Sequence, residues 1–310
     1  PSNVDLTAVA EKGANGSYVV YATIEGGSSM PICIMQSSLR SMLINSDDVK
    51  AKGRSYVDAS KENIATAQMT LRKPDGSVVY DGALEQLKAR GNSTFAFFPK
   101  KSYQIKLATK TDLIGCGEQV KTWVLLAGYT DATQMHDKYF KDLAADMGMP
   151  YTASSDWTDV WYDGEYRGIY LISEKNSIGS TSVNITDMEK NYSVLNTGYG
   201  ENETTAKASN KYGQQFQYTK DLVEPENVTG GYLLELNHEL YDEASGFVTG
   251  KNVGVNVKSP EWCGKDAMEY ISEYYQEFEN AVYATDENGE YTGVNPDTGK
   301  SFDEYCDLNS

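Results

Sequence analysis

The sequence contains few of the residues that build metal sites and nucleophilic triads. Its cysteines are widely spaced and include no Cys-x-x-Cys pair, which fits neither a zinc site nor a dense disulfide framework. We expect buried thiols, with one long-range disulfide left open. Only two histidines are present, so a histidine-based metal site or a serine-type triad has little support. These residues are Cys33, Cys116, Cys263, Cys306, His136 and His238.

Long apolar runs and positive charges are also scarce. No run approaches the length that a membrane span needs. The 310 residues include 27 Lys and Arg against 45 Asp and Glu, which gives a net charge of −18. Such acidity argues against nucleic acid or an anionic membrane as a partner for the whole surface, but it leaves room for a local basic cleft. A chain of this length can bury a core and form one large domain or two ordinary ones.

The stretch 84–107 stands out against this acidic background. Tyr103, Ile105 and Leu107 alternate with polar residues, which predicts a half-buried strand after a Gly/polar turn at 91–94. We therefore predict a β-hairpin. It concentrates four basic residues, Arg90, Lys100, Lys101 and Lys106.

A cluster of positive charge beside a glycine turn is what a phosphate site needs. The alternative is a solvated hairpin tip with flanking lysines, because a glycine-rich turn is a weak signal by itself. Residue chemistry leaves both interpretations open.

The same stretch resembles the signature of CotH kinase-like proteins, which comprise spore-coat protein H and its relatives. The chain reads Arg-Gly-Asn-Ser-Thr-Phe at 90–95 and Lys-Lys-Ser-Tyr-Gln-Ile-Lys at 100–106, with Ser102 where the family usually has Pro. A second motif, Asp-Gly-x-Tyr-x-Gly-x-Tyr-x-x-x-Glu, covers 163–174. A third, Gly-Gly-Tyr-Leu-Leu-Glu-Leu-Asn, covers 230–237, with Asn237 where Asp is usual. The resemblance spans roughly residues 30–310 and implies an α+β, atypical protein-kinase-like fold.

The resemblance also implies roles for individual residues. Arg90, Asn92 and Ser93 would contact the phosphates of ATP, and Lys106 or Lys101 would supply the main positive charge. Glu174 would face either the adenine edge or the Lys106 ammonium, unless it is an ordinary surface residue. Mg²⁺ or Mn²⁺ would accompany the nucleotide, and a protein Ser/Thr would be the acceptor.

The resemblance leaves the catalytic residues unassigned. In relatives the catalytic and metal-binding aspartates follow the last helix, so we expect them beyond Ser310. The expected domains are a polar leader with a first strand at 1–29 and a CotH kinase-like domain at 30–310.

The rest of the chain gives further structural expectations. Strands are predicted at 65–72, 77–80 and 123–127, and a type I′ turn at Asp163-Gly164. A helix capped by Thr130 or Asp131 should pack its apolar residues into the core; these are Met135, Tyr139, Leu143 and Met147. Relatives have an Arg-Asn pair early in this helix, where this chain has Met-His-Asp at 135–137.

Three expectations concern the second half. The polar stretch 176–228 is predicted to be an insertion or flexible excursion. Residues 230–237 should form a strongly buried strand, and Lys265–Tyr283 a helix with an exposed acidic face of Glu269, Glu273, Glu277 and Glu279.

The leading hypothesis is an ATP-dependent protein Ser/Thr kinase of the CotH type. The alternative is a non-catalytic extracellular module that uses the same fold for binding or assembly, in a bacterial surface or carbohydrate-degrading complex. Acidity, the high tyrosine content, the missing arginine early in the helix and Asn237 favour this alternative. The expected location is extracellular or at the cell or spore surface of a bacterium. A carboxylate-pair glycosidase lacks any motif.

Overall fold

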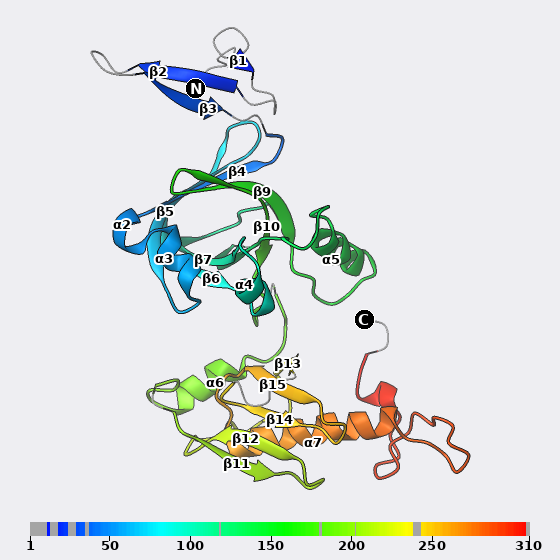
Figure 1. The fold of residues 1–310 in the computed structure, drawn as a ribbon. Helices are drawn as coiled ribbons and strands as arrows, with labels where there is room; N and C mark the ends of the chain where they lie inside the picture. Colours follow the sequence, from blue (N-terminus) through cyan, green and yellow to red (C-terminus); the bar gives the residue numbers. More distant parts are fainter. Residues whose placement is uncertain are drawn as a thin grey trace. The chain divides into compact units, whose positions relative to one another are not determined.

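The computed structural model describes residues 37–117, 119–179, 182–201, 203–237 and 243–307, and the backbone of three earlier strands. These strands are β1 (Glu11–Lys12), β2 (Tyr18–Thr23) and β3 (Ser29–Ile34), which pair antiparallel in that order. The chain divides into two compact units, drawn in Figure 1: Pro1–Asp142 with Ala153–Lys175, and Leu143–Thr152 with Asn176–Ser310. The signature hairpin lies in the first unit.

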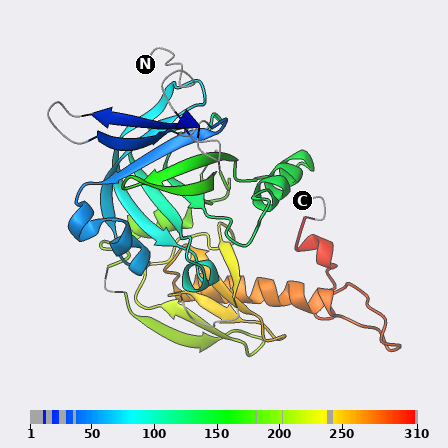
Figure 2. The same ribbon diagram turned by 45° about the horizontal axis from the view of Figure 1, so that its top comes forward.

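The first unit is built around a closed seven-stranded barrel, visible from two sides in Figures 1 and 2. Its strand order is β10-β8-β7-β6-β5-β4-β9. The strands are β4 (Arg40–Ser46), β5 (Ala65–Arg72), β6 (Val78–Arg90), β7 (Ser102–Thr111), β8 (Val120–Leu126), β9 (Ser155–Tyr162) and β10 (Glu165–Glu174).

Alternating side chains fill the barrel. On β7, Tyr103, Ile105 and Leu107 are fully buried, while Gln104 and Lys106 between them are partly exposed. Successive residues of a strand point to opposite faces, so every second residue enters the core. The predicted half-buried strand at 103–107 is therefore confirmed. The largest fully buried side chains of the barrel include Trp123, Tyr162 and Tyr170.

The β9–β10 hairpin closes the barrel. β10 pairs antiparallel with β8, and β9 pairs in parallel with β4. The turn between them has φ of +52° at Asp163 and +78° at Gly164. Positive φ at both central residues is the requirement of a type I′ turn, which confirms the prediction for this step.

Four helices lie around the barrel. They are α2 (Val49–Lys52), α3 (Arg54–Ala59), α4 (Ser93–Phe97) and α5 (His136–Asp146). The prediction that α5 packs apolar residues into the core is wrong. Met135 is 55% exposed, Tyr139 57% and Met147 71%. Helical spacing tells which residues share a face, but not what covers that face.

The start of α5 also differs from the expectation. The helix begins at His136, beyond Thr130 and Asp131. The Asp131 carboxylate nevertheless accepts hydrogen bonds from the backbone N–H of Thr133 and of His136, both at 2.9 Å. It therefore organises the turn that precedes the helix.

The second unit combines a five-stranded sheet with helices. The sheet order is β11-β12-β14-β15-β13. Its elements are α6 (Met188–Leu195), β11 (Thr205–Ser209), β12 (Gln215–Thr219), β13 (Leu233–Asn237), β14 (Gly246–Val248), β15 (Gly254–Ser259), α7 (Lys265–Val282) and the 3₁₀ helix η1 (Phe302–Glu304). None of the helices among the described residues is long and apolar enough to cross a membrane.

The stretch 176–228 is not a flexible excursion where the structure describes it. It contributes α6, β11 and β12, and Met188, Tyr192 and Phe216 are fully buried in the core of the second unit. A few aromatic residues anchor an otherwise polar segment, and composition averaged over the stretch hides them. The prediction of a flexible excursion is therefore wrong for the described residues, and that of an insertion stays a prediction.

Two further expectations for this unit need correction. β13 is an edge strand, and its Leu236 is 65% exposed rather than buried. Glu279 is buried, because its carboxylate accepts hydrogen bonds from the Lys251 backbone N–H and the Gln276 side chain, both at 3.0 Å. An apolar run does not reveal whether its strand is central, and a charge on a helix does not reveal its partners.

Candidate functional site

The signature segment forms the β6–α4–β7 hairpin. Arg90 is the last residue of β6 and lies opposite Ser102 at the start of β7. Gly91 turns the chain with a φ of +101°, a conformation that L side chains rarely adopt. A Cβ at Gly91 would lie 2.1 Å from the Thr94 hydroxyl. The turn therefore depends on glycine at this position.

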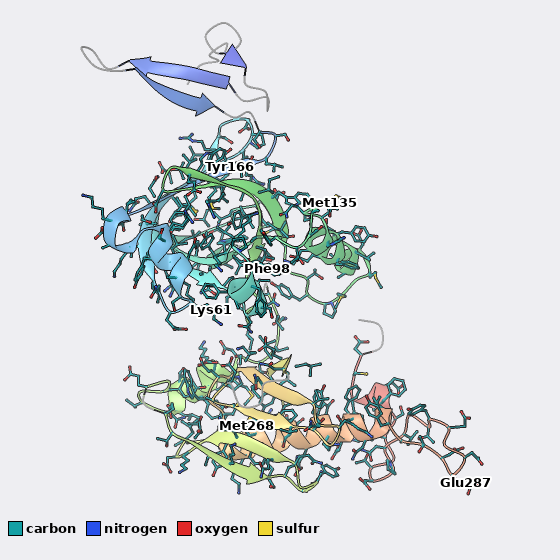
Figure 3. All side chains as sticks on the ribbon, viewed as in Figure 1. Lys61, Phe98, Met135, Tyr166, Met268 and Glu287 are labelled. Carbon is teal, nitrogen blue, oxygen red and sulfur yellow. The ribbon has the colours of Figure 1, made fainter. Side chains whose placement is uncertain are left out.

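Lys101 stabilises this turn. Its ammonium donates hydrogen bonds to the carbonyl oxygens of Phe95 at 2.5 Å and Phe98 at 2.7 Å, and it lies 4.8 Å from the Phe95 ring centroid. The Phe98 ring stacks on Tyr129 at a centroid distance of 5.2 Å. Figure 3 shows the side chains of this region with Phe98 labelled. The charge of Lys101 is engaged in holding the α4 loop.

Lys100 is held in a similar way. Its ammonium donates to the carbonyl oxygens of Ala127 at 2.7 Å and Ile169 at 2.5 Å, and it lies over the Tyr170 ring. Burial lowers the pKa of Lys100 to about 8, and the neighbouring Arg167 adds to that effect. Lys100, which precedes β7, thus contacts β10 and the residue that follows β8 at one end of the barrel.

The other predicted phosphate ligands are spread over the hairpin. Asn92 precedes α4 and accepts a 3.0 Å hydrogen bond from the Lys61 ammonium, and the exposed Ser93 is the first residue of that helix. Lys106 lies on the outer face of β7, with its Nζ 3.3 Å from a carboxylate oxygen of Glu85. The structure pairs Lys106 with Glu85, which also binds Lys121 at 2.9 Å.

Arg90 differs from these lysines in its electrostatic surroundings. Its position in β6 places it on the outer face of the barrel, because the preceding Ala89 points into the core. Burial lowers the pKa of Arg90 below its ordinary value. Within the part of the chain that the structure describes, no carboxylate lies within ion-pair distance of its guanidinium. A half-buried cation without a counter-charge favours binding of an anion.

A residue that the sequence analysis did not select lies close to Arg90. Lys141 of α5 donates a 2.7 Å hydrogen bond to the Ser173 hydroxyl on β10. Burial lowers the pKa of Lys141; among the surrounding charges Asp137 and Glu174 raise it, and Arg90 and Lys138 lower it. In the sequence, Lys141 is an ordinary lysine in a helix that was predicted to pack into the core. That pattern does not indicate that its side chain reaches Ser173.

Glu174 ends β10 near the same group. Its side chain is buried, and its carboxylate accepts a 3.0 Å hydrogen bond from the Ser154 backbone N–H. Because Arg90 and Glu174 both act on the charge of Lys141, the structure brings these two predicted site residues into one neighbourhood. Asn92, Ser93 and Lys101 gather instead around α4, and Lys106 pairs farther along β7.

Two pockets of measurable volume lie away from these residues. One of about 260 Å³ opens beside α2 and α3 and is lined by Arg54 and Tyr162, among others. Another of about 520 Å³ lies beside α6 and is lined by Asn191 and Asn227, among others. Neither contains a residue of the signature hairpin.

The described residues do not provide a metal cage. Among them, no three His, Cys, Asp or Glu side chains converge in a way that could hold a metal ion. The cysteines described with side chains, Cys116, Cys263 and Cys306, form no disulfide, and Cys263 is buried. Side-chain details of Cys33 and His238 lie outside the described residues.

Comparison with known proteins assigns the chain to a family. No curated protein matches the chain. The family model of the CotH kinase protein matches residues 87–252, which begin within β6 and extend past β14, and so cover more than half of the chain. The chain therefore belongs to the CotH kinase family.

Proposed function

We propose that this protein is an ATP-dependent protein Ser/Thr kinase whose nucleotide phosphates bind on the outer face of the β6–β7 hairpin. Family membership supports the class of reaction. The observation that carries the site is Arg90, a half-buried guanidinium at the signature turn without a carboxylate partner among the described residues. Phosphoryl transfer depends mainly on positioning and on neutralising phosphate charge, and a guanidinium is well suited to bind phosphate oxygens in pairs.

The proposal assigns different parts to the other residues of the signature. Asn92 and Ser93 line the turn and offer polar contacts, while Lys101 keeps the α4 loop in shape. Lys106 and Glu174 remain candidate ligands. Mg²⁺ or Mn²⁺ would arrive bound to ATP, because no group of described side chains fits a metal ion by itself. We also propose that the barrel serves as the nucleotide-holding lobe of a kinase-like fold.

Calorimetric titration with ATP, in the presence and absence of Mg²⁺ or Mn²⁺, tests this proposal. We expect binding by the unmodified chain and at least a tenfold loss of affinity in Arg90→Gln, since a charged hydrogen bond is lost. Arg72→Gln is the matched control, because Arg72 is an exposed arginine at the opposite end of the β5–β6 hairpin. A folded chain that does not bind ATP would contradict the proposal.

A second pair of variants separates the role of Lys106 from its ion pair. Lys106→Ala and Lys121→Ala each remove one partner of Glu85. If Lys106 binds phosphate, only Lys106→Ala weakens ATP binding beyond its effect on stability. Equal ATP affinity in the two variants would exclude Lys106 as a ligand and leave Arg90 in place.

The alternative, a non-catalytic extracellular binding or assembly module, makes the opposite prediction. Asn237, where relatives have Asp, ends the edge strand β13 and favours this alternative. Such a module would show no transfer of labelled phosphate from ATP to a Ser/Thr-containing protein. Transfer that is lost in Arg90→Gln but kept in Arg72→Gln would exclude it.

A further inference from the structure

Two positive side chains lie on the outer face of the barrel, Lys141 from α5 and Arg90 from the end of β6. The charge of Arg90 contributes to the lowered pKa of Lys141, although less than burial does. Both side chains are partly buried. Two like charges that are removed from water repel each other more strongly than at a free surface. An anion between them would relieve this repulsion.

The strand registers show which groups share this face. Arg90 lies opposite Ser102 in the β6–β7 pair, and Ser173 lies opposite Val124 in the β8–β10 pair and Ser155 in the β9–β10 pair. Directly opposed residues of paired strands project on the same side of a sheet. Ser155 and Ser173 therefore share a face, and Lys141 reaches it through its hydrogen bond to Ser173.

Ser155 adds an independent sign of a ligand. Its hydroxyl is buried and has no hydrogen-bond partner among the described residues. A buried hydroxyl without a partner is costly in a folded protein, and a water or a bound ion can satisfy it. An oxyanion beside Ser173 would accept the hydrogen bond that Ser155 can donate.

Carboxylates also act on Lys141, and Asp137 raises its pKa more than Arg90 lowers it. Asp137 and Glu174 act on Lys141 from α5 and β10, and Lys138 adds a further positive charge. The Glu174 carboxylate is engaged with the Ser154 backbone N–H, and Lys138 is paired with Asp142 at 2.6 Å. Neither Asp137 nor Glu174 forms an ion pair with Arg90 in the described part of the chain.

We propose that Lys141, which Ser173 orients, is a second phosphate-binding residue that together with Arg90 and Ser155 holds the polyphosphate chain of the nucleotide. This inference rests on the proposed function and adds a ligand from α5 to a site that the hairpin begins. The Lys141 ammonium donates to Ser173, and with nucleotide bound it would also contact a phosphate oxygen. The site takes an oxyanion with several negative charges, such as a nucleoside triphosphate.

The test compares three ligands that separate the phosphates from the nucleoside. ATP, inorganic tripolyphosphate and adenosine are titrated into the full chain and into Lys141→Gln, which removes the charge but can still donate to Ser173. We expect Lys141→Gln to lose about tenfold or more in affinity for ATP and tripolyphosphate, and none for adenosine. Lys141→Arg should restore most of the loss because it restores the charge.

Lys138→Gln is the matched control. Lys138 lies one turn earlier on α5 and pairs with Asp142 rather than reaching Ser173. We expect Lys138→Gln to lose clearly less ATP affinity than Lys141→Gln, because the charge of Lys138 is paired with Asp142. Ser155→Ala is a second, independent variant. Because the Ser155 hydroxyl has no partner among the described residues, this variant should fold normally and lose several-fold in tripolyphosphate affinity.

The outcomes distinguish this inference from the proposed function. If ATP binds equally to the unmodified chain, Lys141→Gln and Ser155→Ala, the inference is overturned and the proposed function stands. If tripolyphosphate binding depends on Lys141 but ATP binds no more tightly than tripolyphosphate, the phosphate site stands and the nucleotide assignment is overturned. If a folded chain binds neither ligand, both are overturned.

Discussion

The hydroxyl of Tyr103, a residue of the signature motif, donates a 2.7 Å hydrogen bond to the carboxylate of Asp58 in α3. The other oxygen of Asp58 accepts a 2.9 Å hydrogen bond from Arg54. Burial raises the pKa of Tyr103 above its ordinary range, so its hydroxyl remains a donor at any pH at which the protein is studied. This bond joins the signature hairpin to the helical segment between β4 and β5.

Removal of that hydroxyl should destabilise the barrel. We expect Tyr103→Phe to lower the free energy of unfolding by about 1–2 kcal/mol, the usual effect of leaving a carboxylate with one partner fewer. Urea denaturation at pH 7 measures it. Tyr80→Phe is the control, since the Tyr80 hydroxyl bonds only to the carbonyl of Ala83, three residues away. Equal stability of Tyr103→Phe and the unmodified protein would show that the bond contributes nothing.

The two signature lysines should differ in their structural importance. Lys101→Met leaves two backbone carbonyls of the α4 loop without their donor, and we expect a loss of about 2 kcal/mol. Lys106→Ala removes an exposed ion pair, and we expect a loss below about 1 kcal/mol. Thermal unfolding of both variants tests the order. A larger loss in Lys106→Ala would contradict this account of the hairpin.

The turn at Gly91 should tolerate no side chain. We expect Gly91→Ala to cost more than about 1 kcal/mol, because its φ of +101° is strained for alanine and its Cβ would meet Thr94. The double variant Gly91→Ala with Thr94→Ala separates the two causes. The double variant should regain the stability lost to the contact with Thr94, but not the stability lost to the positive φ. Full recovery in the double variant would mean that backbone strain contributes little.

Acid should loosen the turn before α5. Hydrogen bonds from Thr133 and from the backbone of His136 lower the pKa of Asp131 from 3.8 to about 2. Between pH 3.8 and about 2 the unfolded state binds more protons than the folded state. The free energy of unfolding therefore falls as the pH decreases from 3.8 to about 2. The indole N–H of Trp157, which donates to the Gln134 carbonyl in this turn, reports the change by NMR. Asp131→Asn should show the altered signal already at neutral pH.

The sequence predicted the local structure of the site well. Alternation at 103–107 identified β7, and the Asp163-Gly164 step identified the β9–β10 turn. Both signals are local: a period of two and a pair of residues that accept positive φ. The signature also located Arg90, which the structure shows as half-buried and without a carboxylate partner among the described residues.

Long-range relationships could not be predicted in this way. Lys141 and Ser173 are 32 residues apart, and nothing in either local pattern indicates that they meet. The exposed face of α5 was predicted to be buried because periodicity identifies a stripe without identifying its neighbour. Lys101 was a candidate phosphate ligand because of its charge, whereas its contacts with two backbone carbonyls depend on the α4 helix, which the sequence did not predict.

The parallel pairing of β4 with β9 has a consequence for how the chain folds. The strands β4 to β8 pair in order along the chain, so they can form a meander as they are synthesised. Until the β9–β10 hairpin is complete, β4 and β8 each present an unpaired edge. Arg40 of β4 meets Thr158 of β9 across 118 residues of chain, and bringing such distant segments together is slow compared with hairpin formation. The late closing hairpin thus defines an interval in which open strand edges can pair with other chains, and in which a chaperone would act on this protein.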